Sequence, residues 1–162
     1  MTALIVIFIT LSLMGSALWV LPPVKERQRM ALRMHARKLG LTVQLTSINL
    51  PDKWDKTTNS HKVAAYSYYR LKPLTSLSNR VLLLPYEVWK YDSVVDGWWS
   101  NGSLNLTEES KIILRKQGGL LLGVQITKDS VSFYWDERGD VTVLEELSKL
   151  VFSLVEIDSL VS

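Results

Sequence analysis

The chain has 162 residues, a formal net charge of +3 and no cysteine. The absence of cysteine excludes disulfides, thiol nucleophiles and cysteine-based zinc sites. The positive charge is local, because residues 24–40 carry six Lys/Arg against one Glu and leave the rest of the chain near −2. Nucleic-acid binding favours a broader basic surface, so we expect no nucleic-acid partner.

Residues 1–23 predict a transmembrane anchor. The run from Ala3 to Leu21 is uncharged and would span about 28 Å as a helix, close to the thickness of a bilayer core. Trp19 suits the headgroup layer, and the two prolines that follow end or bend the helix. Two alternatives stay open. One is a cleaved signal peptide, with small residues at 15–17 resembling a cleavage site, and the other is a buried core helix.

Residues 24–40 predict a basic juxtamembrane helix that starts after Pro23 and ends at Gly40. We expect lipid or surface contacts from Trp19, Lys25, Arg27, Arg29, Arg33, Arg37 and Lys38. A Lys/Arg-rich flank stays in the cytoplasm, which predicts an outside N-terminus and a cytoplasmic C-terminal domain. Sequons at Asn101 and Asn105 would be used only if that domain were translocated. The basic helix is either a solvated connector or a segment attracted to anionic headgroups.

Residues 41–162 predict one small globular α+β domain. Alternating, β-branched and aromatic residues favour strands over 41–48, 61–71 and 80–85, the last with a continuation through Trp89 left open, a short strand within 93–102, and a hairpin from 120–127 and 131–135. Helices are expected over 107–117 and 141–157, with a polar loop over 52–62. Because strands adjoin without intervening helices, we expect an antiparallel or mixed sheet with the C-terminal helix packed on it. One core should contain Leu82, Leu84, Leu121, Val124, Ile126, Val131 and Phe133.

The polar residues form no recognisable catalytic pattern. His35 lies among arginines, and His61 has no carboxylate beside it in sequence. The glycines at 118–123 lack the Gly-Lys-Ser/Thr ending of a phosphate loop, and the acidic residues at 136–140 lack EF-hand spacing. We therefore expect no catalytic residue, no metal site and no cofactor, and we do not expect an enzyme.

Adjacent Trp98 and Trp99 are the candidate contacts for a protein partner. In a strand they would point to opposite faces, and an exposed tryptophan is a common interface anchor. The alternative is that loops cover both.

The segments Ala36–Leu41 and Tyr134–Asp140, together with a single anchor, resemble those of uncharacterised bacterial single-pass membrane proteins with a small cytoplasmic domain. The resemblance implies the cytoplasmic (inner) membrane and no particular activity. We expect a non-enzymatic, membrane-anchored protein-interaction module or accessory subunit of an inner-membrane complex, with another membrane protein as its partner. The alternatives are an anionic-lipid-associated module and an enzyme with dispersed site residues.

Overall fold

The computed structural model describes residues 1–53, 58–77 and 79–156. The chain divides into two compact units, Met1–Ala31 and Leu32–Ser162. The boundary falls inside helix α2 (Val24–Lys38), so the second half of this basic helix belongs to the same unit as the sheet.

The first unit contains helix α1 (Thr2–Val20), which has no buried residue. The hydroxyl of Thr10 donates to the carbonyl of Val6 at 2.7 Å, so this polar side chain is satisfied within the helix. Among the described residues, α1 is the one helix long and apolar enough to cross a bilayer. A signal sequence near an N-terminus has the same length and composition.

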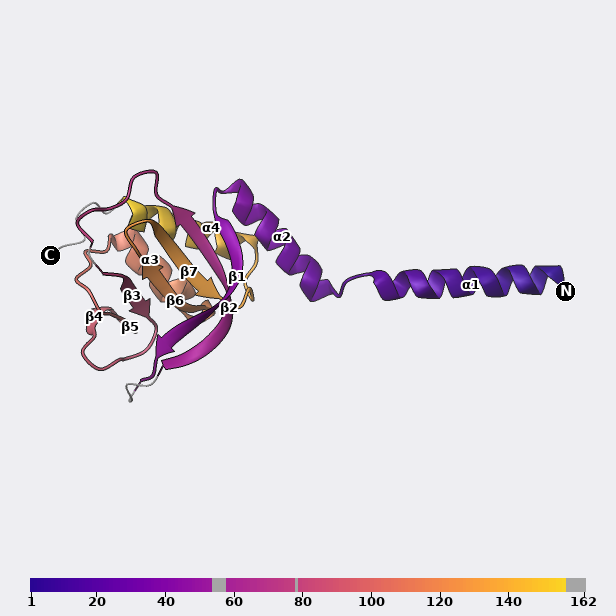
Figure 1. The fold of residues 1–162 in the computed structure, drawn as a ribbon, viewed down its shortest axis with the longest axis horizontal. Helices are drawn as coiled ribbons and strands as arrows, with labels where there is room; N and C mark the ends of the chain where they lie inside the picture. The colour runs from indigo at the N-terminus through magenta and orange to yellow at the C-terminus, as the bar shows by residue number, and fades with distance from the viewer. Residues whose placement is uncertain (54–57, 78, 157–162) are drawn as a thin grey trace. The chain divides into compact units, whose positions relative to one another are not determined.

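The second unit is built on a seven-stranded antiparallel sheet (Figure 1). The strands are β1 (Thr42–Pro51), β2 (Thr58–Tyr69), β3 (Val81–Leu84), β4 (Asp92–Val95), β5 (Trp98–Ser100), β6 (Leu121–Ile126) and β7 (Ser130–Trp135). Their order is β1-β2-β7-β6-β3-β5-β4, so β1 and β4 are the edges. The predicted α+β class is confirmed, and of the two sheet types left open, antiparallel or mixed, the sheet is antiparallel.

Three details of the sheet differ from the sequence prediction. Strand β2 begins at Thr58, inside the expected polar loop, because it pairs residue for residue with β1 as far as Pro51↔Thr58. Residues 93–102 contribute to two strands rather than one, separated by a turn in which Gly97 has φ +81°. The expected continuation of β3 through Trp89 is absent, because a turn closes there with a hydrogen bond from the Tyr91 amide to the Val88 carbonyl at 3.0 Å.

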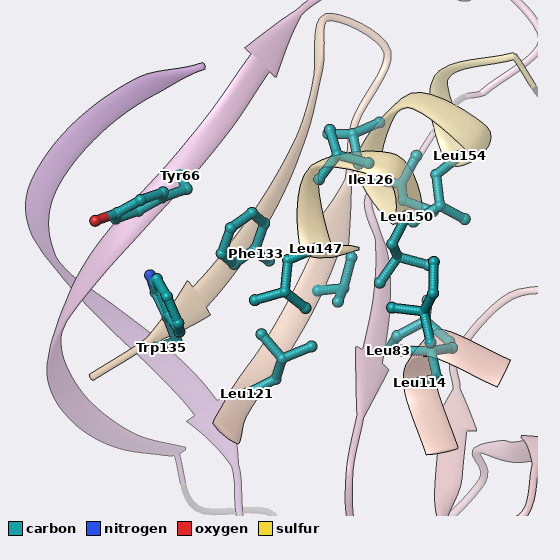
Figure 2. Close-up of a cluster of buried hydrophobic side chains, with 14 of the residues drawn as sticks. Tyr66, Leu83, Leu114, Leu121, Ile126, Phe133, Trp135, Leu147, Leu150 and Leu154 are labelled. Carbon is teal, nitrogen blue, oxygen red and sulfur yellow. The ribbon is translucent and has the colours of Figure 1, made fainter. Parts of the chain in front are cut away.

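Helices α3 (Glu108–Gln117) and α4 (Val141–Val155) pack on one face of the sheet, as Figure 1 shows. Each has a side-chain N-cap, from Thr107 and Asp140 respectively. Leucines at 144, 147, 150 and 154 of α4 are fully buried in one core with the sheet residues Tyr66, Ile126, Phe133 and Trp135. Figure 2 shows Leu147 near Phe133, and Leu150 and Leu154 near Ile126. The prediction of a C-terminal helix with a wide apolar face is confirmed.

The opposite face of the sheet carries a separate apolar layer. Leu83 belongs to the core between the sheet and helices α3 and α4, which we call the helix-side core. Its neighbours Leu82 and Leu84 therefore point to the other face of the sheet. Leu84 packs instead with Leu50 and Val88. The expectation that one core holds all the listed apolar residues is therefore wrong for Leu82 and Leu84, because a run of leucines does not reveal which residues alternate toward the helices.

Gly118 allows the helix-side core to close around Trp98. A Cβ at Gly118 would lie 2.7 Å from Nε1 of Trp98, and this indole also donates to the carbonyl of Leu114 at 3.2 Å. We expect Gly118→Ala to lower the free energy of unfolding by about 1–3 kcal/mol. Gly119→Ala is the matched control, since a Cβ there meets nothing within 4 Å. Urea unfolding followed by tryptophan fluorescence measures both; equal stabilities would contradict the steric argument.

Candidate functional site

The basic residues of α2 divide into exposed cations and cations held by carboxylates. Lys25, Arg27, Arg37 and Lys38 are exposed, as is Trp19 of α1. Arg29 pairs with Glu26 at 3.2 Å on the same helix. Arg33 pairs with Glu137. The seven residues expected to contact lipid or a surface are thus not equivalent.

Arg33, Glu137 and Tyr66 form a polar cluster at the end of strand β7. The guanidinium of Arg33 donates from Nε and Nη2 to the two carboxylate oxygens of Glu137, each at 2.7 Å. The hydroxyl of Tyr66 donates to Oε1 of the same carboxylate at 2.8 Å. The Glu137 side chain is only 4 % exposed, and its backbone has φ +61°. This Arg33–Glu137–Tyr66 cluster joins the second half of α2 to the turn between β7 and α4.

Buried apolar residues and one further polar contact also hold the second half of α2 to the rest of its unit. Leu32 and Ala36, one turn apart on α2, are buried in the helix-side core. His35 contacts Glu145 of α4, with 3.1 Å between Nε2 and Oε1. The second half of α2 is therefore packed within the sheet unit, while its cations Arg37 and Lys38 stay exposed.

The pKa of the Tyr66 phenol is raised well above its usual value near 10, first by burial and then by the adjacent Glu137 carboxylate, while Arg33 opposes the shift. The unfolded chain releases this proton near pH 10, whereas the folded chain holds it to higher pH. The free energy of unfolding should therefore fall as pH rises above about 10.

We expect Tyr66→Phe to make this alkaline decline shallower and to cost about 1 kcal/mol at neutral pH through the lost hydrogen bond. Tyr134→Phe is the matched control, because Tyr134 is another buried phenol with a raised pKa but lies outside the cluster. It should soften the alkaline decline with a smaller loss at neutral pH. Urea unfolding between pH 7 and 11 tests both variants, and an unchanged Tyr66→Phe profile would contradict the assignment.

The two tryptophans expected to contact a partner lie in different environments. Trp98 is only 3 % exposed and belongs to the helix-side core. Trp99 is half-buried, on the opposite side of β5. Of the two, only Trp99 has surface available for another molecule.

The structure places a groove on the sheet face that α3 and α4 leave uncovered. The β1–β2 hairpin curls across this face: the Tyr86 hydroxyl donates to the carbonyl of Pro51 at 2.8 Å, and Leu50 packs on Leu84. A cavity of about 420 Å³ remains beneath it. We call it the sheet groove. Its lining comprises Gln44, Thr46, Ser47, Ile48, Asn49, Leu50, Ala65, Ser67, Tyr69, Arg80, Leu82, Gln125, Ser130, Ser132 and Tyr134.

The floor of the sheet groove is polar but nearly uncharged. Ser67 and Ser132 are buried on adjacent strands, with their hydroxyls 2.6 Å apart. Arg80 is the one charged residue among those that line the groove. Burial raises the pKa of the Tyr134 phenol, and the positive charge of Arg80 partly opposes that shift. Arg80 therefore interacts electrostatically with Tyr134 across the groove lining. Hydroxyl and amide groups with a single cation suit a ligand rich in hydrogen-bonding groups that carries a negative charge.

A second cavity of about 310 Å³ adjoins the sheet groove at Leu50. Its walls are more apolar on average: they include Pro51, Pro85, Tyr86 and Leu122, together with the polar residues Asp52, Lys53, Asn59 and His61. Together the two cavities form a surface with a polar section and an apolar section on the same face of the sheet.

Within residues 1–53, 58–77 and 79–156, no group of three His, Asp or Glu side chains is placed to hold a metal ion. Residues Asp136, Glu137 and Asp140 have separate structural partners: Asp136 pairs with Arg138, Glu137 with Arg33, and Asp140 caps α4. The acidic residues of this turn therefore have structural roles, and Glu137 contributes its carboxylate to the Arg33–Glu137–Tyr66 cluster.

Sequence reasoning missed both the cluster and the groove. Glu137 lies 104 residues from Arg33, and no local pattern pairs them. The polar face of the sheet could have been predicted from the sequence. Ser67, Ser130 and Ser132 alternate with apolar or aromatic residues on β2 and β7, which is typical of a sheet with one exposed face.

Comparison with known proteins gives no match to a family model, a curated protein or a solved structure.

Proposed function

We propose that this chain is a membrane-anchored, non-enzymatic module that binds a segment of another protein in the sheet groove. The observation that carries the proposal is the groove itself, a cavity of about 420 Å³ on the face of the sheet not covered by helices. Its hydroxyl and amide side chains provide donors and acceptors for a polypeptide, and the adjoining apolar cavity provides room for apolar side chains.

The anchor supports a function at a membrane surface. Helix α1 has the length and composition of a bilayer span, and exposed Lys25 and Arg27 follow it. By the positive-inside rule, the N-terminus lies outside and the sheet unit lies in the cytoplasm at the inner membrane. A partner in an inner-membrane complex would then meet the groove at high local concentration.

A photo-reactive residue placed in the groove tests the proposed binding. We expect p-benzoylphenylalanine at Gln125, which lines the groove, to cross-link the full-length protein in membranes to a different protein identified by mass spectrometry. The control position is Lys149, which is exposed on α4. Identical products at both positions, or products at Lys149 alone, would overturn the proposal.

The proposed topology gives a separate prediction that uses the cysteine-free background. Thr2→Cys should react with a membrane-impermeant maleimide in intact cells from which the outer barrier has been removed. Lys149→Cys should react only after the inner membrane is opened. The reverse labelling pattern would place the sheet unit outside and would make the sequons at Asn101 and Asn105 accessible to modification.

A second candidate function, association with anionic lipid, is favoured by the exposed cations of α2. Lys25, Arg27, Arg37 and Lys38 would each contribute about 1 kcal/mol near an anionic surface. We expect the full chain to unfold at a higher temperature in nanodiscs containing phosphatidylglycerol than in neutral ones. Replacing the four cations by Gln should remove that difference, and an unchanged difference would reject this candidate.

A further inference from the structure

Strand β1 contributes six of its ten residues to the lining of the sheet groove. Five consecutive residues, Thr46–Leu50, line the cavity. Successive side chains of a strand point to opposite faces, so five in a row cannot all reach one face by their side chains. The cavity therefore contacts backbone as well as side-chain atoms of β1. Strand β1 is an edge strand, so half of its N–H and C=O groups point away from β2.

This edge lacks the features that prevent strands from pairing with other chains. Strand β1 has 10 residues and carries no charged residue, and its pairing with β2 shows no register shift. Its single proline is the last residue, Pro51. Native sheets commonly protect an edge by charge, proline, a bulge or a short strand.

The other edge of the sheet is protected in three of these ways. Strand β4 has four residues, starts at the charged residue Asp92, and shows a register shift between Ser93 and Val95. Since β4 is protected and β1 is not, the contrast marks β1 as an edge available for an additional strand.

We infer that the groove binds its partner by strand addition: an extended segment of another protein pairs with the free edge of β1 and places a carboxylate near Arg80. The inference rests on the proposed function and specifies how the partner is held. Backbone hydrogen bonds to β1 would supply affinity, and Ser67, Ser132 and Gln125 on the groove floor would contact the side chains of the added strand. Arg80, the one cation in the lining, selects an acidic residue.

The probes are ten-residue peptides, matching the length of β1. They are selected from a random displayed library on the full-length protein in nanodiscs, with empty nanodiscs and the groove-filling variant Gln125→Trp as counter-selections. We expect peptides that contain Asp or Glu and bind with Kd at or below about 100 µM. Recovery of no such peptide would overturn the inference.

Backbone methylation then tests the binding mode without changing the protein. One version of a selected peptide is N-methylated at odd positions and the other at even positions. An added strand turns alternate N–H groups toward β1, so one version should lose binding and the other should retain it. Equal affinities, or equal losses, would overturn strand addition. Hydrogen exchange in the full chain should show new protection within β1, and protection confined to other elements would also overturn it.

Arg80→Gln tests the carboxylate. Arg80 is exposed, so its removal should leave the fold unchanged. We expect about a tenfold loss of affinity for the acidic peptide and little change for the same peptide with Gln in place of Glu. Equal losses for both peptides would reject the charge assignment. If Gln125 cross-links another protein while both methylated peptides bind equally, strand addition fails and the proposed function stands. A cross-link from Gln125 to a second copy of this chain would overturn both.

Discussion

Arg33→Met should lower the free energy of unfolding by about 2–3 kcal/mol, the largest effect expected from any single cation of the basic helix. The carboxylate of Glu137 is 4 % exposed and accepts two hydrogen bonds from Arg33. Removing the guanidinium leaves this buried negative charge without its bidentate partner. The Arg33 side chain is itself 26 % exposed, so we place the loss below that of a fully buried ion pair.

Two further variants isolate the cause. Arg37→Met removes an exposed cation one turn along the same helix and should change stability by less than about 0.5 kcal/mol. Arg33→Met combined with Glu137→Gln removes the buried charge but keeps an acceptor for Tyr66, and it should recover more than half of the loss. Urea unfolding of the full chain in detergent measures all three. If Arg33→Met behaves like Arg37→Met, Arg33 is available for the lipid contact expected from the sequence.

Lysines in place of Ile7 and Ile9 should move the protein out of the membrane fraction. A lysine at the centre of a spanning helix costs about 2.5–3.5 kcal/mol, and Ile7 and Ile9 lie within four residues of the middle of α1, so the pair strongly opposes insertion. The matched control replaces the same two residues by Leu, which keeps the helix apolar. Carbonate extraction followed by centrifugation should leave the control in the pellet and the lysine variant in the supernatant.

The same preparation separates an anchor from a cleaved signal sequence. The intact mass of the wild-type protein extracted from membranes should include all of α1 (Thr2–Val20). A mass that matches a chain starting after the small residues at 15–17 would show that the segment is cleaved, and it would contradict the anchor. Retention of the lysine variant in the pellet would show that the sheet unit, rather than α1, holds the protein to the membrane.

Several features of the fold could be predicted because they depend on residues close together in the chain. The apolar face of α4 arises from leucines spaced three and four apart, and its N-cap from Asp140 directly before it. The hairpin of β6 and β7 arises from two β-rich runs around a short turn. An antiparallel sheet follows from strands that adjoin without crossover helices.

Other features depend on contacts that no local pattern specifies. The polar residues Thr58–Lys62 have the composition of a loop but continue β2, because β1 provides partners for their backbone. The leucines of β3 divide between two faces, and the packing of α3 and α4 on one face decides that Leu83 lies in the helix-side core. Trp98 lies in that core because it packs against the end of α3, where its indole donates to the carbonyl of Leu114.

The sequence by itself determined the anchor-like helix, the local basic charge, the α+β class and the apolar C-terminal helix, because each is a matter of composition or short-range periodicity. The tertiary structure alone decided that Arg33 pairs with Glu137, that Trp98 is buried, and that a polar groove lies beside the edge strand β1. These three outcomes join residues far apart in the chain, and they depend on how the sheet curls and where its helices pack.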